Sequence, residues 1–222
     1  MEVHFDTAKA VKVQNDLRSK IVIEPYKGPL KLIGGADVSF NKYSPTIYAG
    51  IVILEYPTMR VVERASAIMD VTVPYVPGLL SFREIPPLLK AWSNLKMKPD
   101  VMMFDGHGIA HPRRLGIASH AGLLFEIPSL GCAKSLLTGV FEDPEIKAGS
   151  ESVLADKKTK EQIGVVLRTK DKINPVFVSP GHHMDFESAV EITKACVLKH
   201  RIPEPTRHAH LFVNEVRKSY LS

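Results

Sequence analysis

The sequence KLIGGADVSF, residues 31–40, has the pattern of a buried β-strand interrupted by a single carboxylate. Two further strand-like segments follow it, TIYAGIVILEY at 46–56 and MRVVERASAIMDV at 59–71. The breaks between the three, at 41–45 and 57–58, are short. Short connections between apolar, β-branched segments predict an antiparallel meander.

The rest of the chain predicts a sheet that also has parallel strands. An apolar strand at 99–104, a helix at 115–126 and a strand at 129–133 form the pattern of a β-α-β crossover. Further expected elements are helices at 6–21, 81–95, 185–199 and 206–220, and a hairpin of 163–169 with 175–179. Pro86 and Pro87 must then lie in or near the first turn of their helix. The charged stretch 142–162 is expected to be a surface insertion. We therefore predict an α/β fold, a mixed sheet flanked by helices, in a single domain over residues 1–222.

The composition is that of an ordinary globular protein. Of the 222 residues, 45% are hydrophobic and 24% are charged, which argues against a disordered chain. Cys132 and Cys196 lie in apolar contexts and are expected to be buried reduced thiols. The longest apolar run, residues 49–54, is far short of the ~20 residues that cross a membrane. Without a signal sequence in MEVHFDTAKA, we expect a cytoplasmic protein. Its net charge of +5 favours polyanionic partners only mildly.

Three carboxylates are candidates for a metal site. Asp37 lies within an apolar strand, where an unpartnered charge is costly. Asp105 ends the apolar run VMMF, at the edge where α/β sheets place their sites. Glu84 lies on the preceding helix. Together they could bind a hard divalent cation such as Mg²⁺ or Mn²⁺.

Each carboxylate also has a simpler interpretation. Backbone amides could hold Asp37 as a structural acid. Glu84 completes a capping-box pattern with Ser81, and Asp105 could turn the chain at an Asp-Gly pair. These alternatives stay open on the residues alone.

Longer motifs carry a specific resemblance. They are PYVPGLLSFRE at 74–84, FDGHGIAHPRRLGIASH at 104–120, GCAKS at 131–135, SPGH at 179–182 and RIPEPTR at 201–207. In this order and over nearly the whole chain, they closely resemble endonuclease V. The resemblance implies a ribonuclease H-like fold and a Mg²⁺-dependent nuclease, with Mn²⁺ as a substitute. It also implies recognition of deoxyinosine in DNA and hydrolysis of the second phosphodiester bond on its 3′ side, which leaves a 5′-phosphate.

The resemblance also implies roles for individual residues. Asp37, Glu84 and Asp105 match the metal-binding acids, and Lys134 matches a basic residue near the scissile phosphate. His210 falls at a further active-site position that is acidic in some relatives. A histidine there could bind metal or transfer a proton, and the sequence does not choose between the two.

Two segments have the chemistry of base recognition. In Pro74, Tyr75, Val76 and Pro77 the two prolines stiffen a bulky apolar tip, and the resemblance makes this loop a wedge that enters the base stack. A proline-rich turn against the core is the alternative. The glycines near Asp105 could let backbone amides approach hypoxanthine, with His111 lining or stacking on the same pocket. The lesion-pocket candidates are Gly78, Gly106, Gly108, His111 and Gly116.

The remaining basic residues are weaker candidates. The spacing His107-x₃-His111 suggests zinc, but the glycines and Pro112 disfavour a helix there, so we reject a zinc site. His182 and His183 precede a predicted helix and are expected to cap it or bind phosphate. Candidate phosphate contacts are Arg113, Arg114 and Arg207.

Two other functions remain open. A nuclease with the same acids could cut inosine-containing RNA or branched substrates. A module that binds inosine without cutting is disfavoured, because binding alone gains nothing from carboxylates that face phosphate. We expect a monomer with no membrane partner.

Overall fold

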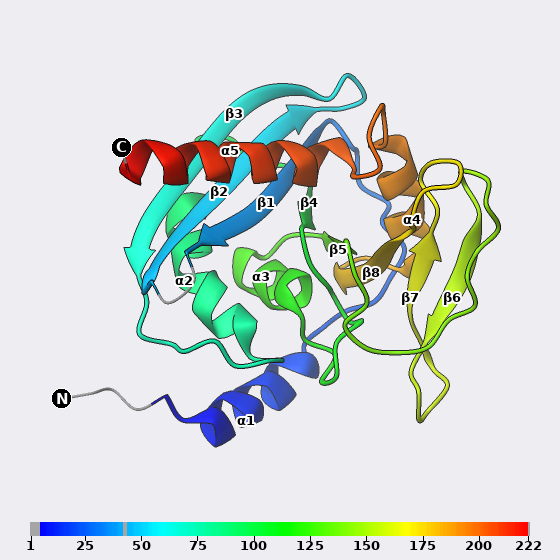
Figure 1. Cartoon of the computed structure of the whole chain (residues 1–222), viewed down its shortest axis with the longest axis horizontal. Coiled ribbons are helices and arrows are strands. Elements are labelled where there is room, and N and C mark those ends of the chain that lie inside the picture. Colours follow the sequence, from blue (N-terminus) through cyan, green and yellow to red (C-terminus); the bar gives the residue numbers. More distant parts are fainter. Residues whose placement is uncertain (1–4, 42–43, 222) are drawn as a thin grey trace.

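A computed structural model describes residues 5–41 and 44–221, which form one mixed sheet with helices on both faces (Figure 1). The strands are β1 Leu32–Phe40, β2 Thr46–Glu55, β3 Arg60–Asp70, β4 Val101–Phe104, β5 Ser129–Ala133, β6 Glu151–Ala155, β7 Gln162–Leu167 and β8 Val176–His182. The helices are α1 Thr7–Arg18, α2 Leu80–Ser93, α3 Ile117–Phe125, α4 Phe186–Ala195 and α5 Glu204–Leu221. The strand order is β3-β2-β1-β4-β5-β8-β7-β6.

The sheet topology confirms the predicted α/β fold. The first three strands form an antiparallel meander, with β2 between β1 and β3. The strands β1, β4 and β5 are parallel neighbours, as the predicted crossover requires. The strands β7 and β8 pair antiparallel, as expected of the 163–169 and 175–179 segments. The centre of the sheet therefore consists of the strands that carry or precede the candidate acids.

Hydrophobic cores fill both faces of the sheet. On one face, Met103 and Leu130 share a cluster with Ala189 of α4 and Ala209 of α5. On the other, Phe104 packs with residues of α2 and α3 such as Leu88. Because both faces are covered, the central strands are apolar on both sides, which explains why alternation is weak in β2 and β4.

The helix α2 contains both prolines close to its start, as predicted. It begins at Leu80, so Pro86 and Pro87 lie in its second turn, next to the first. Each proline removes one backbone donor from the helix. Burial of Ile85, Leu88 and Ala91 against the sheet keeps the segment helical despite this loss.

The segment 142–162 is not only a surface insertion. It contains β6, which pairs with β7 and forms one edge of the sheet. Glu151 and Val153 are exposed in β6 whereas Leu154 is fully buried. An edge strand with one covered face needs few apolar residues. The charged sequence of this segment therefore did not indicate a strand.

Several smaller expectations are settled by the structure. Cys132 and Cys196 are both buried and free, as predicted. Over the described ranges, no helix is long and apolar enough to span a membrane. The first four residues, part of the segment analysed for a signal sequence, lie outside the described residues, as do residues 42–43 of the first break.

Candidate active site

Asp37, on β1, meets Asp105, which directly follows the parallel strand β4. In the register of β1 with β4, Ala36 lies beside Phe104, so the next residue along the chain from each is one of the two aspartates. The backbone amide of Asp105 donates to the carbonyl of Ala36 over 3.1 Å. The pairing of two strands thus brings together two acids that are far apart in the sequence.

The third side chain, His210, comes from α5 on one face of the sheet. Its Nδ1 lies 2.8 Å from Oδ2 of Asp37. The helix can come this close because Gly35 has no side chain: a Cβ there would lie 1.9 Å from the carbonyl oxygen of Pro205. Asp37, Asp105 and His210 each offer a ligand atom within 4.8 Å of the others.

Asn214, one turn further along α5, was missed by the sequence analysis. Its amide nitrogen lies 3.3 Å from Nε2 of His210, and its Oδ1 accepts a hydrogen bond from Ser39 on β1. When Asn214 donates to Nε2, the proton of the imidazole is left on Nδ1, facing Asp37. The i, i+4 spacing of His210 and Asn214 is the only sequence signal for this contact.

Glu84 lies on α2 and is 9% exposed. It is not part of a helix cap: the N-cap residue is Leu79, and no side chain caps this helix. The Oγ of Ser81 instead contacts Nδ1 of His120 at 3.1 Å, inside the protein. The capping-box interpretation is therefore wrong, because the helix begins too early for Glu84 to reach its first amide. Glu84 faces the same cavity as Asp37 and Asp105.

The pKa values of Glu84 and Asp37 are both raised. Burial, followed by the charges of Asp37 and Asp105, raises the pKa of Glu84 to about 8. Burial and the charge of Asp105 also raise the pKa of Asp37, against the hydrogen bonds from His210 and the Val38 amide. Buried carboxylates that repel one another are the arrangement that a divalent cation stabilises, and their oxygens suit a hard ion. The residues present therefore fit a metal site.

Lys134 follows β5 and brings a positive charge to the acids. Its ammonium forms an ion pair with Oδ2 of Asp105. The carboxyl of Asp105 is mostly covered, whereas the side chain of Lys134 is 39% exposed. The ammonium can therefore reach both Asp105 and a group that enters from solvent.

A cavity of about 440 Å³ connects the acids with the candidate base-recognition residues. Of the predicted pocket, Gly78, Gly106, His111 and Gly116 line it, whereas Gly108 packs against the Pro180 carbonyl instead. Of the predicted wedge, Tyr75 and Pro77 line the cavity, and Pro74 and Val76 are not among the lining residues. Lining residues that the sequence analysis did not single out for this pocket include Ser81, His107, Leu115, Ile117, Leu136 and Leu137.

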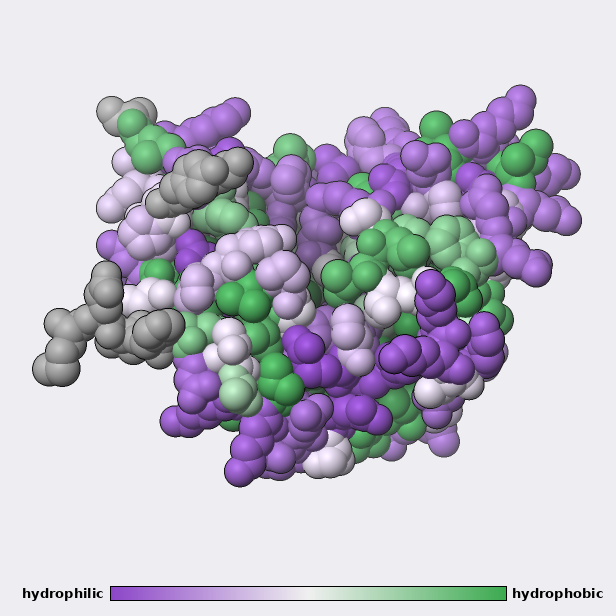
Figure 2. All heavy atoms as spheres, turned by 60° about the horizontal axis from the view of Figure 1, so that its bottom comes forward, coloured by the Kyte–Doolittle hydropathy of each residue, from purple (hydrophilic) through white to green (hydrophobic). Residues whose placement is uncertain are grey.

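The cavity has an apolar side. Leu136 and Leu137 are 44% and 47% exposed and follow Lys134 after one intervening serine. Figure 2 brings the α1 side of the molecule forward and shows apolar surface among hydrophilic residues on that face. The exposed leucines provide an apolar surface next to the charged surface of the buried acids. A nucleotide needs both, an apolar surface for its base and a charged one near its phosphate. The only sequence signal for these two leucines is their position shortly after Lys134, in the sequence KSLL.

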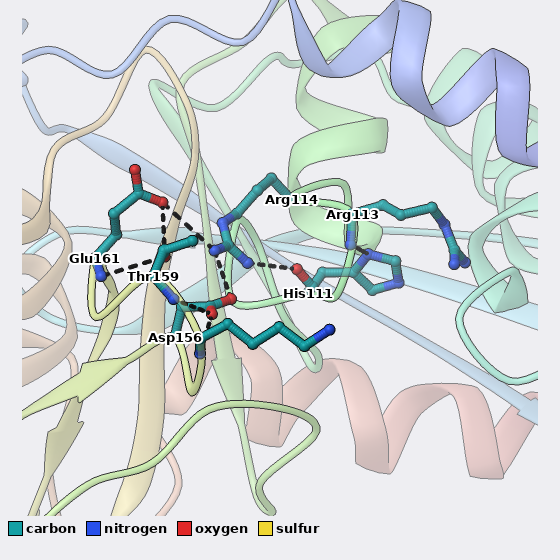
Figure 3. A network of polar contacts seen from close by, with 7 residues as sticks. His111, Arg113, Arg114, Asp156, Thr159 and Glu161 are labelled. Carbon is teal, nitrogen blue, oxygen red and sulfur yellow. Dashed lines mark hydrogen bonds and ion pairs between the residues drawn. The ribbon is translucent and has the colours of Figure 1, made fainter.

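The three arginines proposed as phosphate contacts are engaged within the protein. Figure 3 shows that Arg113 and Arg114 extend in opposite directions from the loop that carries His111. Arg114 donates to Asp156 over 2.7 Å and to the carbonyl of His111 over 3.1 Å, which joins this loop to the β6–β7 turn. Arg207 contacts Glu204. Their role toward phosphate stays a prediction.

Three other histidines singled out in the sequence, His107, His182 and His183, have partners within the protein. The Nε2 of His107 lies 3.1 Å from the carbonyl of Ser135. His182 ends β8 and accepts a hydrogen bond from the Val22 amide, while His183 pairs with Glu24 at 2.6 Å. Neither caps the next helix, whose N-cap is Asp185, so that expectation was wrong. Aspartate is a stronger N-cap than histidine because its carboxylate accepts from the backbone amides.

Comparisons with known proteins show which family the chain resembles. Residues 15–211 match the endonuclease V family. The chain is 47% identical to an endonuclease V of Dictyoglomus thermophilum over 92% of this chain and 88% of the relative. It superimposes on the crystal structure of an endonuclease V from Streptomyces avermitilis with a TM-score of 0.93, at 38% identity, over 99% and 96% of the two chains.

A further solved relative carries nucleic acid. It is an endonuclease V of Ciona intestinalis in complex with a 24-mer DNA that contains an inosine followed by a ribo-adenosine. The TM-score is 0.86 at 30% identity, over 96% of this chain and 98% of that one. From these matches and the site described above, we conclude that the chain is a nuclease and belongs to the endonuclease V family.

Proposed function

We propose that the chain is a deoxyinosine-directed DNA repair endonuclease that hydrolyses the second phosphodiester bond on the 3′ side of the lesion. The observation that carries this proposal is the shared cavity. It joins Asp37, Glu84, Asp105 and Lys134 to Tyr75 and the glycines of the predicted lesion pocket. Its size falls in the range of small-ligand sites, which suits a single base turned out of the stack.

Asp37, Glu84 and Asp105 would hold Mg²⁺, or Mn²⁺ in its place, with His210 next to Asp37. A divalent ion there supplies a water of lowered pKa and neutralises charge that develops on the phosphate. His210 orients the carboxylate of Asp37 and is itself oriented by Asn214. Lys134 places a fixed cation beside Asp105, where it can stabilise the extra negative charge of the transition state.

The cavity would hold the base while the acids hold the backbone. Tyr75 is 64% exposed at the cavity, so it can replace the base that leaves the stack. Leu136 and Leu137 offer an apolar surface to the base, and a close fit of the base against the backbone of Gly106 and Gly116 would exclude an exocyclic amine. Hypoxanthine lacks that amine, which distinguishes it from guanine.

The test is a nicking assay on a labelled duplex with one deoxyinosine, in Mg²⁺ and in EDTA. Wild type is compared with Asp37→Ala and Asp105→Ala. We expect a Mg²⁺-dependent nick one nucleotide beyond the lesion, and none from either variant. Binding without a cut by wild type would favour a sensor. Equal cutting of undamaged or branched DNA would remove the lesion assignment but keep the acids.

Inosine in RNA is a second candidate substrate. The observation that favours it is the ribo-adenosine next to the inosine in the strand bound by the Ciona relative. Matched strands with deoxyinosine or inosine, each followed by a deoxy- or a ribonucleotide, would rank these substrates by kcat/KM. We further propose that the enzyme acts as a monomer in the cytoplasm, which sedimentation and cell fractionation would test.

A further inference from the structure

The loop that carries Tyr75 ends in a tight turn. The backbone amide of Leu79 donates to the carbonyl of Val76 over 2.9 Å, which closes a four-residue β-turn. Pro77 occupies its second position, and Gly78 occupies its third with φ of +76°. Proline followed by a residue with positive φ is the arrangement of a type II turn. Glycine is required here because other residues rarely adopt that φ.

The turn is fastened to α1 through the carbonyl of Gly78. The Nε2 of Gln14 donates to this oxygen over 3.0 Å, and Nη2 of Arg113 donates to it as well. The Nε of Arg113 also donates to Oε1 of Gln14. The three groups therefore form a closed set, in which each side chain contacts both the turn and the other side chain.

Gln14 is an unusual residue for this position. It is 0% exposed, and Ala10, at 5%, is the only other buried residue on the described helix α1. An apolar residue would fill the same place without the cost of desolvating an amide. The side-chain amide of Gln14 instead uses both of its polar atoms: the nitrogen donates to the carbonyl of Gly78, and the oxygen accepts from Arg113. The contact thus serves the turn and not only the docking of α1.

We propose that Gln14 and Arg113 are positioning residues that hold the 74–79 turn, so that Tyr75 stands at the cavity before DNA arrives. The proposal rests on the proposed function, because it assigns the loop to opening the base stack. A loop that is already ordered loses less conformational entropy when it enters DNA. Arg113 is accordingly a residue that acts through the protein backbone rather than on phosphate.

The first experiment replaces Gln14 by a residue of similar size that cannot form hydrogen bonds. For Gln14→Met we expect KM for an inosine duplex to rise about tenfold, from the loss of hydrogen bonds to the turn, with kcat changed less than twofold. On single-stranded inosine DNA there is no stack to open, so KM should change little. The matched control is Asn15→Ala, an exposed neighbour on the same helix, which should behave as wild type.

The second measurement is hydrogen exchange of the 74–79 peptide without DNA. Gln14→Met should exchange faster there than wild type while peptides of β1 and β4 keep their protection. Gln14→Glu retains an acceptor for Arg113 but no donor for Gly78, so its KM and exchange should lie between the other two. If Gln14→Met fails to fold, Gln14→Glu alone tests whether Gln14 positions the turn.

The outcomes separate this proposal from the proposed function. If wild type cuts the inosine duplex but the variants keep their KM and exchange, the positioning role is wrong and the function stands. An equal rise of KM on single and double strands, or a fall of kcat alone, also overturns it. If wild type does not cut inosine DNA at all, the function fails, and the exchange measurement still tests the fastening of the turn.

Discussion

Arg201 donates a hydrogen bond from Nη2 to the backbone carbonyl of Lys134 over 2.8 Å. Its Nε and Nη2 also donate to the carbonyls of Asn174 and Pro175, each over 2.7 Å. One guanidinium thus joins the segment after β5 to the segment before β8. The ammonium of Lys134 reaches Asp105 from this fixed stretch of backbone.

Arg201→Gln should lower kcat about tenfold and leave KM nearly unchanged, because Lys134 would no longer be held beside Asp105. Steady-state kinetics on an inosine duplex would measure this. Arg60→Gln, which removes an exposed arginine from an ion pair with Glu55, is the matched control and should leave kcat and KM unchanged. In a Lys134→Met background, Arg201→Gln should have no further effect; an additive loss would contradict the assignment.

Glu84→Gln should make the stability of the metal-free protein less dependent on pH. The pKa of Glu84 is raised to about 8, so its contribution to stability is full below the unfolded value of 4.5 and is lost as pH rises through 8. In EDTA, wild type should lose about 3 kcal/mol more than the variant between pH 5 and pH 8. Urea unfolding of both proteins at both pH values measures the difference. An equal loss of stability in wild type and variant would refute the prediction.

His210→Ala should weaken Mn²⁺ binding about 10- to 100-fold, because it removes both a possible ligand and the group that orients Asp37. Binding can be followed by the electron paramagnetic resonance signal of free Mn²⁺. His210→Asp restores an oxygen ligand and should recover part of the affinity. Asn214→Ala should have a smaller effect, since it only frees the ring. Unchanged affinity in His210→Ala would exclude this histidine from the metal site.

His120 should make the protein sensitive to acid. Burial lowers the pKa of His120 to about 4, so the folded state holds it neutral. Its contribution to stability is present above the unfolded value of 6.5 and is lost as pH falls through 4. Between pH 7.5 and pH 5, wild type should lose about 2 kcal/mol more stability than His120→Asn. His200→Asn, which replaces an exposed histidine, is the matched control variant measured beside it.

The central strands and the acids were predictable because they depend on local pattern. Apolar runs with short breaks define the meander, and a carboxylate within such a run is conspicuous. The helix that contains Pro86 and Pro87 was also predictable from its pattern, and packing against the sheet offsets the helix-breaking tendency of the two prolines. The strand β6 was not predicted, because an edge strand has only one covered face and lacks the apolar pattern of a central strand.

The partners of the arginines could not be predicted for a different reason. Arg113 meets Gln14 across 99 positions of sequence, and nothing near either residue indicates the other. A sequence pattern shows that a residue is basic, but not whether its charge faces solvent or a carbonyl. The same holds for Leu136 and Leu137, whose role depends on the cavity beside them.

The packing of α5 against Gly35 has a consequence for how the enzyme is made. Asp37 lies near the start of the chain and His210 near the end of the described residues, and the two meet only when α5 rests on β1. During translation, the early strands can therefore form while the candidate site is still incomplete. A nascent chain on the ribosome, surrounded by RNA, brings His210 to Asp37 only after α5 has been synthesised and docked.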